Sequence, residues 1–321
     1  MKEKSFFLCI DKPAGMTSHD VVALMRYFLQ CKRIGHTGTL DPFATGVLVL
    51  AVGHCTRLIQ YIPQAPKIYQ TRIQLGIETE TADCDGTIIS ERFVPHYSRK
   101  DLEKIVQSFT GSIEQYPPKY SAIKVKGKRL YEYAREGLDV EIPSRIVDIQ
   151  SIDLQGYSSD SIDCRIQCSK GTYIRSLGVD IARSMGTVAH LSQLRRLQSD
   201  GFTIAHSCSL EEFSELLCGS REWKKCLARG GEKFAPRCST EELLHRLKPF
   251  LHPKEAIFSQ MTVYQATSDE HARISVGLSL KKEIASVGER VAIFHQKELI
   301  AIAEQQSGLL KLLRVMPETA N

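Results

Sequence analysis

The stretch RIGHTGTLDPFATGVLVLAVGH, residues 33–54, combines a single carboxylate with a long apolar run. Asp41 stands in a turn rich in glycine and threonine, and residues 46–53 follow as a continuous apolar segment between two glycines. Such a run predicts a strand that is buried on both faces. An acid directly before a buried strand is a candidate functional group, although Asp before Pro is also ordinary turn chemistry.

The segments around this stretch predict both strands and helices. Residues 4–13 read as a short strand that Pro13 ends, and residues 17–30 as a helix capped at Thr17 or Ser18. Residues 68–76 alternate, which places Tyr69 on the same face as Ile73 and Leu75. The mixture favours a mixed α+β fold over regular strand–helix–strand repeats.

Composition favours a globular intracellular protein. The 321 residues include 42% hydrophobic residues, enough for a sizeable core. The start lacks the apolar core of a signal peptide, and no run approaches the roughly 20 apolar residues of a membrane span. The 10 cysteines are scattered without a C-x-x-C pair, which indicates a reducing cytoplasm. Cys164 and Cys168 share one face of a predicted strand, where core filling is commoner than metal binding.

Basic residues gather in two segments, although the formal net charge is only +5. Residues 119–135 hold six Lys or Arg against one Glu, and residues 221–237 hold six against two acidic residues. Such segments suggest an anionic polymer as partner, with a solvated surface as the plainer alternative.

Familiar uses of a glycine-rich turn do not fit residues 33–54. The sequence has no G-x-x-x-x-G-K-[ST] and no G-x-G-x-x-G, so these two phosphate-binding loops are unsupported. Only His36 stands close to Asp41 as a second metal ligand, and we predict no metal site.

Six ordered motifs resemble the TruB-type pseudouridine synthases, which isomerise one uridine in the T loop of tRNA, at tRNA position 55. The motifs span about 200 residues and are GHTGTLDPFATGVLVLAVGHCTRLIQYI (35–62), KPAGMTSHDVV (12–22), KIYQTRIQLGIETETADCDG (67–86), PPKYSAIKVKGKRLYEYAREG (117–137), KGTYIRSLGVDIA (170–182) and HLSQLRR (190–196). The resemblance implies a large, mostly antiparallel central sheet flanked by helices. It also implies catalysis without a cofactor.

The resemblance assigns the site residues by motif. Asp41 matches the nucleophile, Arg175 the arginine that pairs with it through two parallel hydrogen bonds, and Tyr69 the tyrosine that stacks on the base and serves as general base. The residues matching substrate-binding positions are His36, Arg57, Asp83, Tyr173 and Leu194. Turn geometry remains an alternative for Asp83, a surface position for Arg175, and core packing for Tyr69, Tyr173 and Leu194.

The resemblance also suggests how RNA is held. Residues 117–145 match a mobile thumb that closes on the RNA, with Lys124, Lys126 and Lys128 near a hairpin tip and facing phosphates. We expect a catalytic domain over residues 1–210, a charged linker or insertion over 211–257, and a small β-rich module resembling PUA domains over 258–321.

The expected function is thus tRNA pseudouridine synthesis in the cytoplasm, with the T-arm stem-loop as partner and neither a membrane nor an obligate protein partner. Two alternatives remain at this point: a guide-RNA-dependent pseudouridine synthase and a non-catalytic tRNA-folding chaperone.

Overall fold

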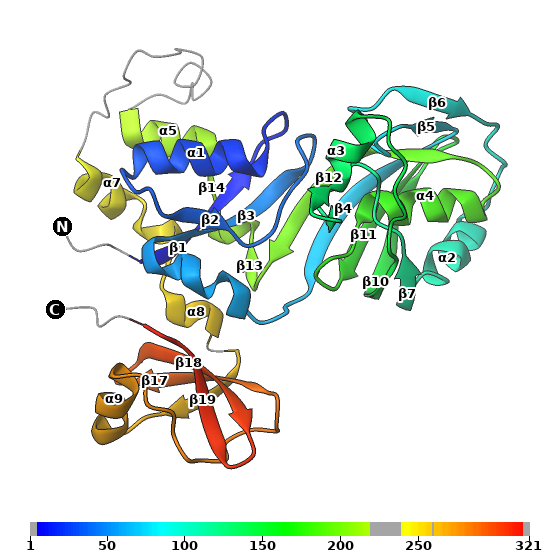
Figure 1. Ribbon diagram of the computed structural model, residues 1–321. Coiled ribbons are helices and arrows are strands. Elements are labelled where there is room, and N and C mark those ends of the chain that lie inside the picture. Colours follow the sequence, from blue (N-terminus) through cyan, green and yellow to red (C-terminus); the bar gives the residue numbers. More distant parts are fainter. Residues whose placement is uncertain (1–4, 219–238, 259, 317–321) are drawn as a thin grey trace.

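An 11-stranded sheet, mostly antiparallel, runs through the molecule (Figure 1). This computed structural model describes residues 5–218, 239–258 and 260–316. The strands of the sheet are β1 (Phe6–Lys12), β2 (Ile34–His36), β3 (Thr45–Val52), β4 (Lys67–Leu75), β7 (Gly111–Gln115), β10 (Arg145–Tyr157), β11 (Ser161–Cys168), β12 (Ala189–Ser199), β13 (Phe202–Thr203), β14 (Cys208–Ser209) and β15 (Leu251–His252). Their order is β14-β1-β3-β12-β4-β11-β10-β7, with β2 and β13 beside β3 and β12, and β15 beside β1.

The late strand β12 lies between β3 and β4, which follow one another in the chain. It pairs in parallel with β3 through Arg195 and Arg196, and antiparallel with β4 along most of its length. The sheet therefore has two halves that β12 joins. The turn containing Asp41 belongs to one half and Tyr69 to the other.

One face of this sheet is covered by helices. These are α1 (Ser18–Phe28), α2 (Arg99–Gln107), α4 (Ile174–Ser184), α5 (Leu210–Cys218) and α7 (Thr240–Arg246). Their buried side chains share one hydrophobic core with the sheet. The predicted start of α1 is confirmed, because Thr17 and Asp20 form a capping box in which each side chain accepts the other residue's backbone N–H.

The apolar run of β3 is buried on both faces, as predicted. Leu48 and Leu50 point into the helix-covered core, whereas Val47 and Val49 enter a second core on the opposite face. In β4 burial alternates, and Tyr69 is buried with Thr71, Ile73 and Leu75. Among the described residues, this second core covers the other face of the sheet at β1, β3 and β13.

A small four-stranded sheet forms the C-terminal module, which confirms the β-rich prediction (Figure 1). Its elements are β16 (Thr262–Gln265), α9 (Ser268–Ser275), β17 (Arg290–His295), β18 (Glu298–Gln306) and β19 (Leu309–Val315). Residues of β17 and β18, with α8 (Lys254–Phe258), build the second core against β1 and β3. The basic segment 221–237 lies outside the described residues.

Short elements complete the structure. They are η1 (Gly53–Tyr61), β5 (Ile77–Thr79), β6 (Ile88–Glu91), β8 (Lys124–Val125), β9 (Lys128–Arg129), α3 (Leu130–Arg135), η2 (Ile204–His206) and η3 (Lys248–Phe250). Strands β8 and β9 form the predicted hairpin, with Lys126 and Gly127 at positive φ in its turn. None of the described helices is long and apolar enough to cross a membrane. Cys164 and Cys168 are buried free cysteines of β11.

Candidate active site

Asp41 lies in a turn between β2 and β3 that neighbouring groups hold from several sides. The Lys12 ammonium donates to the carbonyl of Pro42 at 3.2 Å, and the backbone N–H of Gly15 donates to the same carbonyl at 2.9 Å. The Ser18 hydroxyl both donates to the Leu40 carbonyl and accepts from the Leu40 N–H. These hydrogen bonds fix the turn, while the Asp41 side chain remains 32% exposed.

Arg175 stands in the first turn of α4 and approaches Asp41 through two atoms. Its Nη2 donates to Asp41 Oδ1 at 3.1 Å, and its Nε lies 3.0 Å from Asp41 Oδ2. The Nε–H, however, is buried without a hydrogen bond, so the expected pair of parallel hydrogen bonds is reduced to one. The same guanidinium also donates to Asp83 and to the carbonyls of Thr81 and Tyr120.

Asp83 combines the turn geometry and the site contact that the sequence left as alternatives. Its Oδ1 accepts from the Thr81 hydroxyl at 2.5 Å and from the Asp85 N–H at 3.1 Å. Its Oδ2 lies 3.2 Å from Arg175 Nη1, and the side chain is buried. The two carboxylates therefore hold opposite sides of one buried guanidinium, which compensates its charge.

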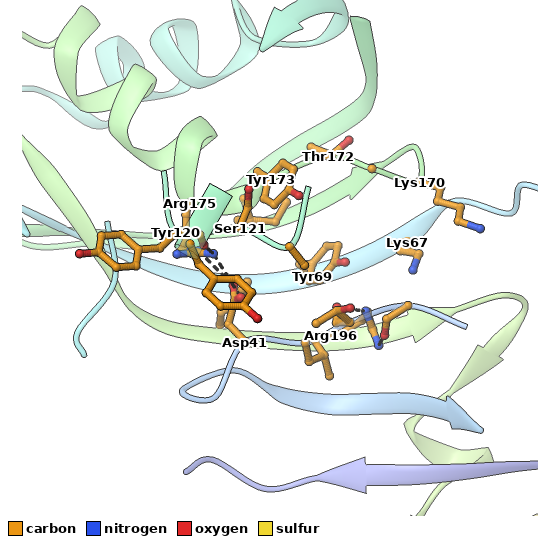
Figure 2. Close-up of a pocket in the computed structure, with 18 residues that line it drawn as sticks. Asp41, Lys67, Tyr69, Tyr120, Ser121, Lys170, Thr172, Tyr173, Arg175 and Arg196 are labelled. Carbon is orange, nitrogen blue, oxygen red and sulfur yellow. Dashed lines mark hydrogen bonds and ion pairs between the residues drawn. The ribbon is translucent and has the colours of Figure 1, made fainter. Parts of the chain in front are cut away.

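A cavity of about 380 Å³ opens beside Asp41 (Figure 2). Tyr69 from β4, Leu194 from β12 and Tyr173 at the start of α4 line it with apolar surface. Gln115 accepts from the Tyr173 N–H and donates to the Tyr173 carbonyl, which fixes the backbone there. The volume falls within the range of about 300–1,000 Å³ that is usual for small-ligand sites.

The structure also places three cations that the motif assignment missed. Lys12 and Arg196 are fully buried, and Lys67 is 5% exposed. The strand periodicity could have predicted the burial of two of them. Lys67 precedes Tyr69 by two residues and Arg196 follows Leu194 by two, so each cation shares a strand face with a site residue. The alternation that buries the apolar member of each pair also buries the cation. Arg196 donates to the carbonyls of Val47, Thr39 and Gly38 at 2.8, 3.2 and 3.0 Å.

Burial dominates the protonation of the site. It raises the pKa of Asp41, with Asp83 adding to the rise, whereas Arg175 and Lys12 oppose it. Burial also raises the pKa of Tyr69, against the effect of neighbouring Arg196. The phenol therefore stays protonated at neutral pH.

The remaining candidates lie outside the cavity lining. His36, in β2, packs edge to face on His19, and burial lowers its pKa to about 4, so the ring is neutral at neutral pH. Arg57 is exposed on η1. Lys124 and Lys126 are exposed on the hairpin, whereas Lys128 pairs with Glu136. Across the described residues, no three or more His, Cys, Asp or Glu side chains gather as a metal site would require.

Comparison with known proteins gives two adjacent family matches. Residues 26–174 match the TruB family pseudouridylate synthase (N terminal domain), and residues 175–259 match the tRNA pseudouridylate synthase B C-terminal domain. A protein of Shouchella clausii named tRNA pseudouridine synthase B is 36% identical over 323 residues, covering 99% of this chain and 98% of the relative. The chain belongs to the TruB family of pseudouridylate synthases.

Further relatives agree with membership of the TruB family. A protein of the same name from Acaryochloris marina is 49% identical over 212 residues, covering 65% of this chain and 73% of the relative. Among solved structures, a Cbf5-Nop10-Gar1 complex contains a chain that superposes with a TM-score of 0.69 at 23% identity, covering 97% of this chain and 84% of that one. This similarity supports the mixed α+β fold of the TruB-family chain.

Proposed function

We propose that this enzyme converts the uridine at position 55 in the T loop of tRNA into pseudouridine. The observation that carries the proposal is the Asp41–Arg175 ion pair at one end of the cavity that Tyr69 and Leu194 line. A flipped base fits such a site because it stacks on an aromatic ring while an acid reaches its sugar or ring atoms. The tRNA-specific names of full-length relatives support the substrate class.

In the proposed reaction Asp41 is the nucleophile. The bond between N1 of uracil and C1′ of ribose breaks, the base turns, and C5 bonds to C1′ while N1 gains a proton and C5 loses one. The carboxylate attacks either C1′ or C6, and both routes release the hydrogen from C5. Arg175 keeps the carboxylate oriented and favours its ionised form.

Tyr69 is proposed to stack on the base and to remove a ribose proton. Its raised pKa keeps the hydroxyl protonated in the free enzyme, so proton abstraction requires a neighbour that stabilises the phenolate. Arg196 is that neighbour, because it lowers the pKa of Tyr69 against burial. Tyr173 and Leu194 close the apolar walls, and Asp83 acts through Arg175.

The surrounding RNA is proposed to contact His36, Arg57 and the hairpin lysines. His36 and Arg57 belong to the same half of the sheet as Asp41, and the hairpin is part of the proposed thumb, residues 117–145. Ser121, Ala122 and Tyr131 of this segment line the cavity, and the Tyr120 carbonyl accepts from Arg175. We retain residues 1–210, 211–257 and 258–321 as the proposed division into catalytic domain, linker and PUA-like module.

Release of tritium from a T-arm transcript labelled at C5 of uridine tests the proposal. We expect release without guide RNA, and we expect Asp41→Asn to abolish it while RNA affinity stays within a few-fold, since the amide keeps the size of the side chain but loses its nucleophilicity. Exposed Asp153→Asn on β10 is the matched control and should keep full activity.

Three outcomes would contradict parts of this proposal. Substantial turnover by Asp41→Asn would exclude Asp41 as nucleophile. Release only with an added guide RNA would indicate the guide-dependent alternative. Tight binding with no release by the unaltered enzyme would indicate a folding chaperone.

A further inference from the structure

The charges that line the cavity do not balance. Its lining contains four cationic side chains and one carboxylate, Asp41. Arg175 is compensated, because it pairs with both Asp41 and Asp83. The other three cations are Lys67, Lys170 and Arg196. Figure 2 shows Lys67 and Lys170 across Tyr69 from the Asp41–Arg175 pair, so the cavity has a second, cationic end.

Lys67 is the most unusual of these cations. It is 5% exposed, and the structure gives its ammonium no hydrogen bond or ion pair with any described residue. Its Nζ lies 2.5 Å from the point that a Cβ on Gly38 would occupy, so glycine leaves room for the ammonium beside the Asp41 turn. The Lys67 side chain is largely removed from solvent and lines the cavity, and a ligand that supplies negative charge there would offset the cost of burying its charge.

The groups around Lys67 do not neutralise this end of the cavity. Arg196 donates only to neutral carbonyl oxygens. Burial and Arg196 lower the pKa of Lys67, and the opposing effect of the Asp200 carboxylate is smaller than either. Lys170 stands exposed at the rim and adds a further positive charge.

We propose that Lys67, supported by Arg196 and Lys170, binds one backbone phosphate of the RNA beside the flipped nucleotide. This inference rests on the proposed function, which makes RNA the ligand. A phosphate next to the target is the anion that such a substrate brings to the cavity together with its base. Holding it across Tyr69 from Asp41 would fix the sugar between two anchored ends, which is how positioning accelerates a reaction at the sugar or base.

Neutral phosphate analogues test this inference. Two T-arm RNAs would each carry one methylphosphonate linkage, either 5′ or 3′ of the target uridine, and binding would be measured in the Asp41→Asn background to prevent turnover. We expect one of the two linkages to weaken binding about 10-fold, because a charge-assisted hydrogen bond is lost. Lys67→Met should weaken binding of unmodified RNA by a similar factor and should be insensitive to that linkage.

The same variants give an independent measure by salt titration. Lys67→Met should lower the slope of log affinity against log salt concentration by about one contact, whereas Lys104→Met, which removes an exposed lysine of α2, should leave the slope unchanged. Thermal melting of each variant reports whether it folds. The binding of the two methylphosphonate RNAs to the Asp41→Asn protein, which keeps Lys67, does not depend on whether Lys67→Met folds.

Two results would overturn the inference. If both methylphosphonate RNAs bind the Asp41→Asn protein as tightly as unmodified RNA, no phosphate is bound there. If the losses from Lys67→Met and from the neutral linkage simply multiply, Lys67 contacts another part of the RNA, such as a base carbonyl. Absence of tritium release by the enzyme with unaltered side chains would instead refute the proposed function, so the two failures are distinguishable.

Discussion

At the scale of single residues, the site is organised around cations that bind backbone carbonyls as well as carboxylates. Arg175 donates to two carbonyls beside its two acids, Arg196 to three carbonyls, and Lys12 to the carbonyls of Pro13, Met16 and Pro42. Neutral acceptors satisfy the N–H groups without cancelling the charge. The surroundings of Asp41 therefore stay electropositive, which suits an anionic substrate.

Gly46 shows how closely the Asp41 segment approaches β12. Its φ is +104°, and an added Cβ would lie 2.1 Å from the carbonyl oxygen of Arg196. We expect Gly46→Ala to lower the free energy of unfolding by more than about 3 kcal/mol, because the clash is with backbone that cannot rotate away. Urea unfolding monitored by circular dichroism measures this loss.

Gly186 provides the control for Gly46. Its φ of +72° is also positive, but an added Cβ would meet no atom within 4 Å. Gly186→Ala should therefore cost only about 1 kcal/mol, the penalty of the left-handed conformation. Equal losses in the two variants would mean that β3 and β12 move apart without cost.

Sequence reasoning identified Asp41, Tyr69 and Arg175, and the structure places all three at one cavity. Lys67 and Arg196 were missed because a charged residue in a sequence is ordinarily read as solvated, and their burial depends on β12 entering between β3 and β4. Arg57 illustrates the opposite difficulty. It is close to Asp41 in sequence, but the direction of a side chain on a short helix is set by packing that the sequence does not display.

At the scale of elements, the lysines of the β8–β9 hairpin differ in their contacts: two are exposed and one forms an ion pair. The Lys128 ammonium pairs with Glu136 and lies 5.1 Å from the ring centre of Tyr133, whereas Lys124 and Lys126 are exposed. A lysine held by its own protein gains less from a phosphate. From the sequence, all three lysines were predicted to face phosphates, because the contacts of Lys128 arise only when α3 folds beside the hairpin.

We expect replacement of Lys124, Lys126 and Lys128 by Ala to weaken RNA binding and flatten its salt dependence, with most of the effect retained in the Lys124→Ala/Lys126→Ala double variant. In the double variant, the slope of log affinity against log salt should become shallower by the amount expected for about two phosphate contacts. Affinity measured over a salt series provides the value. The matched control is Lys100→Ala/Lys104→Ala at exposed positions of α2, and an equal change there would remove the hairpin from the interface.

At the scale of the whole molecule, the C-terminal module shares a core with the catalytic sheet. Phe7 of β1 and Val49 of β3 pack in one cluster with Phe258, Ala292 and Ile302. Polar contacts accompany it, since the Tyr61 hydroxyl donates to the Leu313 carbonyl at 3.2 Å. The continuous apolar run of β3 predicted burial on both faces, but which segment covers the second face could not be read from the run itself.

This shared core predicts cooperative unfolding. We expect one calorimetric transition for the whole chain, and we expect Phe258→Ala, at a fully buried position, to lower the free energy of unfolding by about 3–5 kcal/mol. Val276→Ala, at a residue that is 73% exposed, is the control and should change little. Two separate transitions, with only the smaller one shifted by Phe258→Ala, would show that the module unfolds alone.

The position of β12 has a consequence for how the enzyme is made. The strand that supplies Leu194 and Arg196, and that joins the two halves of the sheet, is synthesised after every other strand between β1 and β11. A growing chain that ends before residue 189 has Asp41 and Tyr69 on two halves of the sheet that no strand yet joins. The cavity lined by residues of both halves can therefore form only after β12 has been made and has paired with β3 and β4.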